Sequence, residues 1–284
     1  MAHRLISGLV LSGLLAVPVA AQPPEGYLDI QVAKVKMGKR AEFDAINKRF
    51  AEINRKNNGD RWLAYENWYG GGNTVYFVSS RPNYAGVAEA LKAFQGALTK
   101  ALGPAGASKI LNDWDTTVDS EEMQLRRRRW DLSAGAPANA ESYNRIVGQA
   151  RFLRIAVVRV RPGRLLQFEA QLKQTRAAQE RVNEGFPVFV SQSVAGQPAG
   201  VFYITTLLKS LEDLDKVKPI QEVLGPDYAS YQAASAENTA ATDILICRFL
   251  PELSNAPEEI AAVDRKFWRP APTPPAAPKA LGAK

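Results

Sequence analysis

The sequence predicts an α+β protein in which one β-α-β-β-α-β unit is written twice. A strand, a tight turn and a helix at Val32–Phe50 recur later in the chain at Val157–Leu172. Two further landmarks also repeat: an Asn-X-Gly helix stop at 57–59 and 183–185, and a Leu-Gly-Pro break at 102–104 and 224–226. Similarity at several separate landmarks favours an internal duplication over chance.

The first unit is predicted at 22–132. It opens with a strand at Tyr27–Lys36 in which apolar and polar residues alternate. A helix follows, because apolar residues recur at helical spacing from Phe43 to Ile53. The remaining elements are a hairpin at Arg61–Tyr69 and Thr74–Ser80, a helix at Val87–Leu102, and a closing strand at Met123–Trp130.

The second unit, at 150–254, repeats this order after a linker at 133–149 that is rich in Ala, Gly, Pro and Asn. Its predicted elements are a strand at Phe152–Val160, a helix at Arg164–Val182, a hairpin at Phe186–Val194 and Gly200–Thr206, a helix that opens at Leu211, and a closing strand at Asp243–Leu250. Residues 255–284 form a C-terminal extension, whose Pro- and Ala-rich end predicts a disordered tail.

Residues 1–21 have the pattern of a secretory signal peptide. Arg4 supplies the positive charge, Leu5–Val17 is a short apolar run, and Val19-Ala20-Ala21 is a small-residue cleavage site. The apolar run is short for a membrane span, and no later run is long enough, so we expect no transmembrane segment in the mature chain. The pattern predicts a periplasmic or secreted protein.

Histidine and cysteine usage narrows the chemistry. The single histidine, His3, lies in the predicted signal peptide, and Cys247 is the single cysteine. We therefore expect no histidine-based nucleophile, no histidine-ligated zinc or haem, and no intrachain disulfide. Cys247 lies in an apolar run, which predicts a buried, inert thiol. We expect no metal and no cofactor.

The formal net charge of +7 is modest for a chain of 284 residues. It allows an anionic ligand but argues against nucleic acid as a partner. The oligomeric state is left open by the sequence.

The order β-α-β-β-α-β is that of the ferredoxin-like module, whose helices cover one face of the sheet. Two such modules over Tyr27–Ser254 resemble the dimeric α/β-barrel superfamily, which includes antibiotic-biosynthesis-type monooxygenases, NIPSNAP-like proteins and haem-dependent peroxidases. The resemblance implies two ferredoxin-like repeats packed sheet to sheet as a pseudo-dimeric α/β barrel. Cofactor-free monooxygenases of that superfamily use pocket Asn, Trp, Tyr and Arg side chains, and such residue types occur here at Tyr65, Asn67 and Trp68.

Alternation along the two opening strands predicts which faces point inward. The apolar sets at 28, 30, 32 and at 153, 155, 157 are expected to meet the helices, which would turn Asp29 and Arg154 into the shared interior. The two charges could pair there. The alternative is that both lie near strand ends in solvent.

The closing strand of the first unit carries four consecutive arginines at 126–129. Its parity predicts that Gln124, Arg126 and Arg128 point into the barrel, where guanidinium groups would bind a carboxylate, phosphate or sulfate. The alternative is an edge strand protected by charge.

The candidate ligand-binding residues are therefore Tyr65, Asn67, Trp68, Arg126, Arg128 and Arg154. No residue is assigned a catalytic role. Three functions stay open: binding of a small aromatic or anionic ligand in the inter-sheet cavity without metal or haem, a cofactor-independent monooxygenase or isomerase acting on an aromatic substrate, and a non-catalytic protein that binds another envelope protein.

Overall fold

The computed structural model describes residues 25–183 and 185–270. The predicted signal peptide at 1–21 and most of the predicted disordered tail lie outside this range. Within the described ranges, none of the helices combines the length and the apolar character needed to cross a bilayer.

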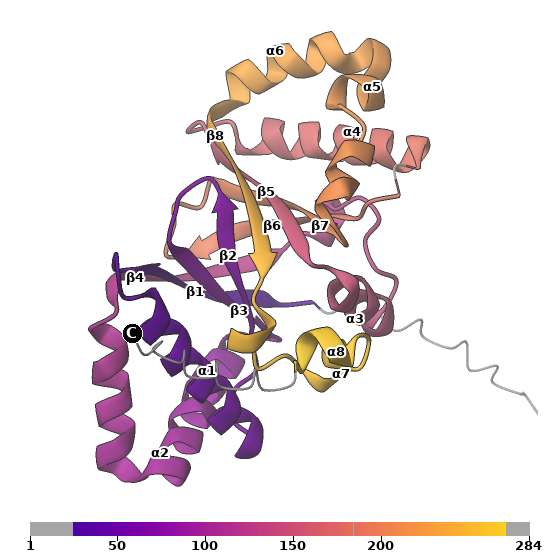
Figure 1. The fold of residues 1–284 in the computed structure, drawn as a ribbon. Coiled ribbons are helices and arrows are strands. Elements are labelled where there is room, and N and C mark those ends of the chain that lie inside the picture. The colour runs from indigo at the N-terminus through magenta and orange to yellow at the C-terminus, as the bar shows by residue number, and fades with distance from the viewer. Residues whose placement is uncertain (1–24, 184, 271–284) are drawn as a thin grey trace, which may run out of the picture.

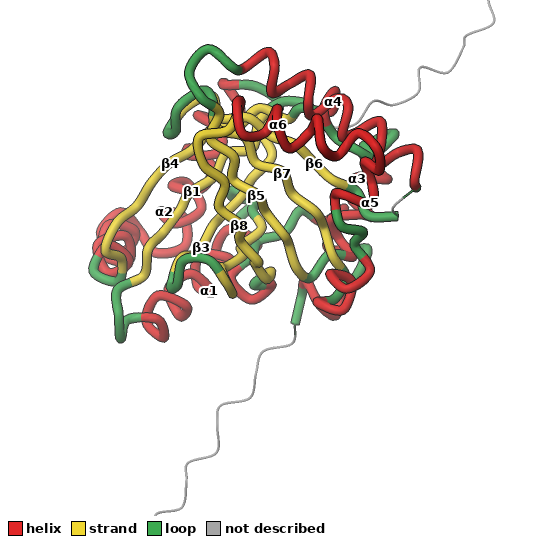
Figure 2. The backbone as a smooth tube through the Cα atoms, turned by 90° about the horizontal axis from the view of Figure 1, so that it is seen from above, coloured by secondary structure: helices red, strands yellow, loops and turns green. Residues whose placement is uncertain are grey.

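The described strands close into one antiparallel barrel, with helices on its outside (Figure 2). The predicted α+β fold is confirmed in this form. The order around the barrel is β1 (Tyr27–Val35), β3 (Thr74–Arg81), β2 (Leu63–Tyr69), β8 (Thr239–Phe249), β5 (Phe152–Val160), β7 (Val201–Leu208), β6 (Val188–Ala195) and β4 (Val118–Arg128).

Each half of the chain contributes four neighbouring strands, β4-β1-β3-β2 and β8-β5-β7-β6. Two seams join them: β2 pairs with β8, placing Tyr65 opposite Phe249, and β4 pairs with β6, placing Arg128 opposite Ser191. Because β4 is paired on both sides, the alternative of a charge-protected edge strand is wrong. Closing both seams satisfies the backbone groups that an open edge would expose.

Helices α1 (Arg40–Lys56) and α2 (Tyr84–Asp115) cover the first four strands, while α4 (Leu165–Val182), α5 (Ile220–Leu224) and α6 (Tyr228–Asn238) cover the others (Figure 1). The predicted Leu-Gly-Pro breaks are present. Gly103 and Gly225 both have positive φ, 71° and 55°, which glycine adopts without strain. Short 3₁₀ turns occur at Trp130–Leu132, Leu211–Lys216, Gly225–Asp227 and Pro251–Leu253.

Helix α3 (Ala140–Gln149) lies within the predicted linker, and α7 (Glu258–Ala261) and α8 (Arg265–Trp268) lie within the predicted extension. All three lie together beside the barrel (Figure 1). Trp268 is fully buried: its indole Nε1 donates to the carbonyl oxygen of Gly148 at 2.9 Å, and its ring lies 5.3 Å from that of Phe249. Tyr143 and Val147 of α3 line the barrel interior. These helices therefore close one end of the barrel.

The predicted orientation of the two opening strands is wrong. The register of β1 with β4 places Leu28 opposite Arg126 and Ile30 opposite Gln124, and residues directly opposite each other share a face. Leu28 and Ile30 therefore face the interior, and Asp29 lies on the helix side. In β5, Arg154 likewise lies on the helix side.

The reason is that both faces of these strands include apolar residues. Ala33 and Val35 of β1 are buried in the core beneath the helices, as are Ala156 and Val158 of β5. Alternation alone does not tell which of two apolar faces meets the helices.

Arg129 ties the β4–β6 seam to the helix layer. It is 7% exposed, and its guanidinium donates to Asp131, to Oε1 of Glu169 on α4 at 2.6 Å, and to Oε1 of Gln192 on β6 at 2.7 Å. These hydrogen bonds lower the pKa of Glu169 and of Asp131. Arg129 is thus a structural arginine with its charge neutralised by two carboxylates.

Replacing Glu169 with Gln should lower the free energy of unfolding by about 1 kcal/mol at pH 7. Because the pKa of Glu169 is lower in the folded protein than in the unfolded chain, this stabilisation is complete above the unfolded value of about 4.3. It is lost as the pH falls through the lower folded value. In urea unfolding, the difference between wild type and variant should therefore narrow between about pH 5 and pH 3.

The exposed pair of Arg176 and Glu180 on the same helix provides the control. Glu180→Gln should change stability by less than about 0.5 kcal/mol. A difference between wild type and Glu169→Gln that stays constant with pH would contradict the assignment.

Trp268→Ala should lower the free energy of unfolding by about 3–5 kcal/mol, because it removes a fully buried ring and leaves the Gly148 carbonyl without its donor. Trp68, which is 46% exposed, is the matched control. Trp68→Ala should cost less than about 1 kcal/mol. Equal losses for the two variants, measured by urea unfolding, would show that α8 does not close the barrel as described.

Candidate functional site

The barrel interior contains two cavities. The larger, the mouth cavity, has a volume of about 520 Å³ and is bordered by Glu122, Arg159, Gln197 and Asp243 at its polar end. The smaller, the inner cavity, has about 100 Å³ and lies towards α3. Tyr65, Arg126 and Ile155 line both, so these three side chains form the layer that separates them.

Arg126 is 5% exposed and lies on the inner wall. Its guanidinium donates to Oε1 of Gln124, with Nε at 3.0 Å, and its Cζ lies 3.2 Å from the ring centroid of Tyr203. The Tyr203 hydroxyl donates to the same Gln124 oxygen at 3.2 Å. Gln124 in turn donates to Glu122 at 2.8 Å. Among the described residues, Arg126 has no carboxylate within ion-pair distance.

Arg128 also faces the interior, but its hydrogen bonds are made within the protein. Its guanidinium donates to Ser80 Oγ at 2.5 Å and to the Tyr143 hydroxyl at 3.3 Å, and it lies 5.3 Å from the Tyr143 ring centroid. The Glu25 and Tyr27 carbonyls accept from it at 3.5 Å. Arg128 therefore connects the barrel wall to α3.

Tyr65 stacks on Tyr76 inside the barrel, with ring centroids 4.8 Å apart. Burial raises the pKa of the Tyr65 hydroxyl, and the positive charge of Arg126 opposes this rise. The hydroxyl has no hydrogen-bond partner among the described residues. Tyr65 therefore presents a neutral O–H donor to the cavities at neutral pH.

Asn67 lies at the mouth of the barrel, where its amide nitrogen donates to the carbonyls of Gly70 and Gly71 at 3.2 and 2.9 Å. Its Oδ1 accepts a hydrogen bond from the Cys247 thiol at 3.2 Å. Burial raises the pKa of Cys247 to about 12, so the thiol stays protonated at neutral pH. This agrees with the predicted buried, inert cysteine. The side chain of Asn67 is used to hold the Gly70–Gly71 turn.

Trp68 lies outside the barrel. Its ring stacks on Phe152, with centroids 5.4 Å apart, and the Arg248 guanidinium lies 5.2 Å from its centroid. The structure therefore does not bring Trp68 together with Tyr65 and Arg126. Side chains alternate between the two faces of a strand, and Trp68 lies three residues after Tyr65, so the two point to opposite faces.

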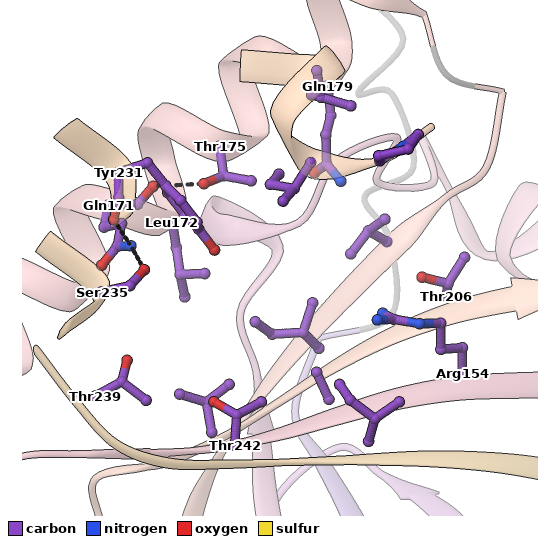
Figure 3. A pocket seen from close by; sticks show the side chains of 18 of the residues that line it. Arg154, Gln171, Leu172, Thr175, Gln179, Thr206, Tyr231, Ser235, Thr239 and Thr242 are labelled. Carbon is purple, nitrogen blue, oxygen red and sulfur yellow. Dashed lines mark hydrogen bonds between the residues drawn. The ribbon is translucent and has the colours of Figure 1, made fainter. Parts of the chain in front are cut away.

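Arg154 lies in a third space, the helix-side pocket, between the outer face of β5, β7 and β8 and the helices α4, α5 and α6. This pocket has a volume of about 740 Å³. Figure 3 shows the guanidinium of Arg154 pointing into it from the strand layer. Arg154 has no hydrogen-bond or ion-pair partner among the described residues.

The opposite wall of the helix-side pocket is held in place by hydrogen bonds between α4 and α6. Gln171 donates to Ser235 Oγ at 2.5 Å (Figure 3). It also donates to the Tyr231 carbonyl at 3.3 Å and accepts from Asn238 at 3.3 Å. The apolar part of the lining includes Ala156, Val158, Phe168, Leu172, Ile204, Val217, Ile220 and Val223.

The first half has a corresponding pocket of about 480 Å³ between β1, β3 and the helices α1 and α2. There Asp29 takes the strand position that Arg154 takes in the second half. Arg81 neutralises it at 3.1 Å and also pairs with Asp60 at 2.7 Å. The residue at the position of Arg81 in the second half is Leu208, as the registers of β3 and β7 show. Arg154 is therefore left without a partner of this kind.

The charges lining the two pockets differ in sign. The first-half pocket is lined by Asp29, Asp60, Asp115 and Glu121 together with Arg81. The described residues that line the helix-side pocket include Arg154 and Lys218 but no carboxylate. Of these two pockets, the helix-side pocket is thus the one whose charges favour a negatively charged ligand.

Sequence reasoning missed Tyr203, Gln171 and Ser235. The repeat itself could have found Tyr203, because it lies opposite Val157 as Tyr76 lies opposite Val32. No signal in the sequence points to Gln171 or Ser235, whose contact depends on how α4 packs against α6. Among the described residues, no group of three or more His, Cys, Asp or Glu side chains could hold a metal ion.

No protein-family model matches the sequence, and no curated protein matches it. Solved structures similar in fold include an anthrone oxidase-like protein, which is 10% identical, with TM-score 0.46, covering 81% of this chain and 95% of that one. A haem-binding protein from Thermus thermophilus is 10% identical, with TM-score 0.45, covering 82% of this chain and 97% of that one. A mutant chlorite dismutase from Candidatus Nitrospira defluvii is 10% identical, with TM-score 0.44, covering 86% and 96%. At these values the likeness concerns the fold alone.

Comparing Arg81→Leu with Arg154→Leu tests whether Arg154 has a structural role. Arg81→Leu should lower the free energy of unfolding by about 3 kcal/mol, because it leaves two partly buried carboxylates without their partner. Arg154→Leu should change it by less than about 0.5 kcal/mol, because no contact is lost. Urea unfolding of the two variants measures the difference. A large loss for Arg154→Leu would mean that its charge stabilises the fold.

Proposed function

We propose that this chain is an exported binding protein for a small amphipathic anion, which it holds in the helix-side pocket. The observation that carries the proposal is the Arg154 guanidinium, which points without a partner into a pocket of about 740 Å³ whose described lining has no carboxylate. The pocket size is typical of small-molecule sites. This site differs from the inter-sheet cavity expected from the sequence, because Arg154 points away from the barrel interior.

The lining defines the ligand class. Arg154 would bind a carboxylate, sulfonate or phosphate through two parallel N–H donors, while the aliphatic wall and Phe168 would cover an apolar body. Thr206, directly opposite Arg154 in the β5–β7 ladder, adds a hydroxyl beside the anion position. An apolar ligand with one anionic end fits this arrangement.

The lining favours binding over catalysis. The polar side chains in the described lining are hydroxyls, amides and two cations, so a carboxylate general base is not supplied. The donor set also does not fit a histidine-ligated haem, since histidine, cysteine and methionine are absent from the described lining. A cofactor-independent oxygenase or isomerase therefore remains the second hypothesis, and an envelope interaction protein the third.

We also propose that the two halves arose by duplication of one ferredoxin-like unit, giving a pseudo-dimeric barrel. The same relative strand order, the paired helix stops and the paired Leu-Gly-Pro breaks support this. In this view the residue at the strand position shared by Asp29 and Arg154 changed after the duplication. One copy became a neutralised structural pair, and the other became an anion-binding position.

The anionic dye 1-anilinonaphthalene-8-sulfonate and the neutral dye N-phenyl-1-naphthylamine, both fluorescent when bound in apolar pockets, test the proposed site. Wild-type protein should bind both. Arg154→Leu should weaken binding of the anionic dye about 10- to 100-fold, because a charge-assisted hydrogen bond contributes about 1.5–3 kcal/mol. The neutral dye should bind as before, and Arg154→Lys should retain part of the affinity for the anionic dye.

Arg164, an arginine of the same half that is 43% exposed and near Glu237, provides the control. Arg164→Leu should leave both dyes unaffected. Equal affinity of wild type and Arg154→Leu for the anionic dye would refute the proposal. Oxygen uptake with an aromatic substrate would favour the oxygenase hypothesis instead.

A further inference from the structure

The mouth cavity inside the barrel has features of a second site, separate from the helix-side pocket. Its aliphatic walls come from Val32, Ile155, Val157 and Leu245. Tyr65, Tyr76 and Tyr203 add aromatic surface. The cavity has about 520 Å³, within the range of small-molecule sites.

Arg126 differs from the other buried arginines on the barrel wall. Arg81 and Arg129 each pair with two carboxylates, and Arg128 is bound by hydroxyl and carbonyl groups. Arg126 has one neutral acceptor, Gln124, and the face of the Tyr203 ring. Arg126 and Arg128 are thus the members of this group without a carboxylate partner in the described structure, and Arg126 has fewer hydrogen-bond acceptors than Arg128.

Tyr65 is the second buried group with unused hydrogen-bonding capacity. It is 4% exposed, and its hydroxyl has no partner among the described residues. Tyr65 and Arg126 line the same two cavities. No described buried side-chain nitrogen or oxygen is both sealed from solvent and without a partner. The free hydroxyl and the free N–H edge of Arg126 therefore open onto the cavities.

A buried guanidinium without an anion is costly, and a bound carboxylate offsets that cost. One guanidinium edge and one O–H match the two oxygens of a single carboxylate. Glu122 at the mouth disfavours ligands with more negative charge, whereas Asp243 there is paired with Arg159. The stacked Tyr65 and Tyr76 rings beside the cavity favour a planar apolar body.

We propose that the mouth cavity binds a small aromatic monocarboxylate, with Arg126 and Tyr65 as its donors. The ligand would enter at the polar end, where Arg159 and Asp243 form an exposed pair. The opposite end is closed by α3 and α8. This site goes beyond the function proposed for the helix-side pocket and does not use Arg154.

Calorimetric titration of the full chain with benzoate tests this site, and neutral benzamide serves as the matched probe. All titrations use the Arg154→Leu background, which removes the anchor of the helix-side pocket. Benzoate should bind at least about 10-fold more tightly than benzamide. Adding Arg126→Leu should abolish this preference. Adding Tyr65→Phe, which removes one hydroxyl, should weaken benzoate binding about 3- to 10-fold.

Thermal unfolding without ligand separates loss of the site from loss of the fold. Arg126→Leu should have the same melting temperature as its parent or a higher one, because it removes a buried charge without a counter-ion. Tyr65→Phe keeps the ring stack and provides a readout should Arg126→Leu not fold. Failure of benzoate to bind at millimolar concentration, or equal binding by the parent, Arg126→Leu and Tyr65→Phe, would overturn the proposal. The dye experiment at Arg154 is independent of either result.

Discussion

The antiparallel pairing of β2 with β8 and of β4 with β6 is the constraint on which the structure depends. The four-stranded sheet of each half has two edge strands whose outer backbone groups need hydrogen-bond partners. The edge strands of the other half supply those partners. The pairing converts two sheets into a closed wall with an inside and an outside. It also places β4, with its three arginines at 126–128, in the middle of that wall and not at an edge.

Closure places the buried arginines of the wall either inside the barrel or beneath a helix layer. On the helix side, Arg81 and Arg129 are neutralised by carboxylates from neighbouring elements. Arg126 and Arg128 inside the barrel and Arg154 beneath the second helix layer have no carboxylate partner in the described structure, but Arg128 is bound by hydroxyl and carbonyl groups. Arg126 and Arg154 are therefore the positions where an anionic ligand would gain most.

The two halves share a strand order but differ in chemistry at equivalent positions. The registers align Asp29 with Arg154 on the outer face, and Arg126 with Cys247 on the inner face. One member of each pair is satisfied: Asp29 by Arg81, and Cys247 as a protonated, buried thiol. The other is a cation without a carboxylate. Similar backbones thus carry different sites.

The sequence by itself determined the element order and the repeated helix stops and breaks, because these depend on local periodicity and on residues with special backbone geometry. It offered the inward direction of Gln124, Arg126 and Arg128 as one of two alternatives, and the pairing of β4 on both sides decided between them. The sequence did not determine the orientation of β1 and β5, because both faces of each strand include apolar residues. Only the tertiary structure decided that Arg154 and Trp68 lie outside the barrel and that α3, α7 and α8 close it. Those outcomes depend on strand register and on contacts between distant segments, which periodicity does not encode.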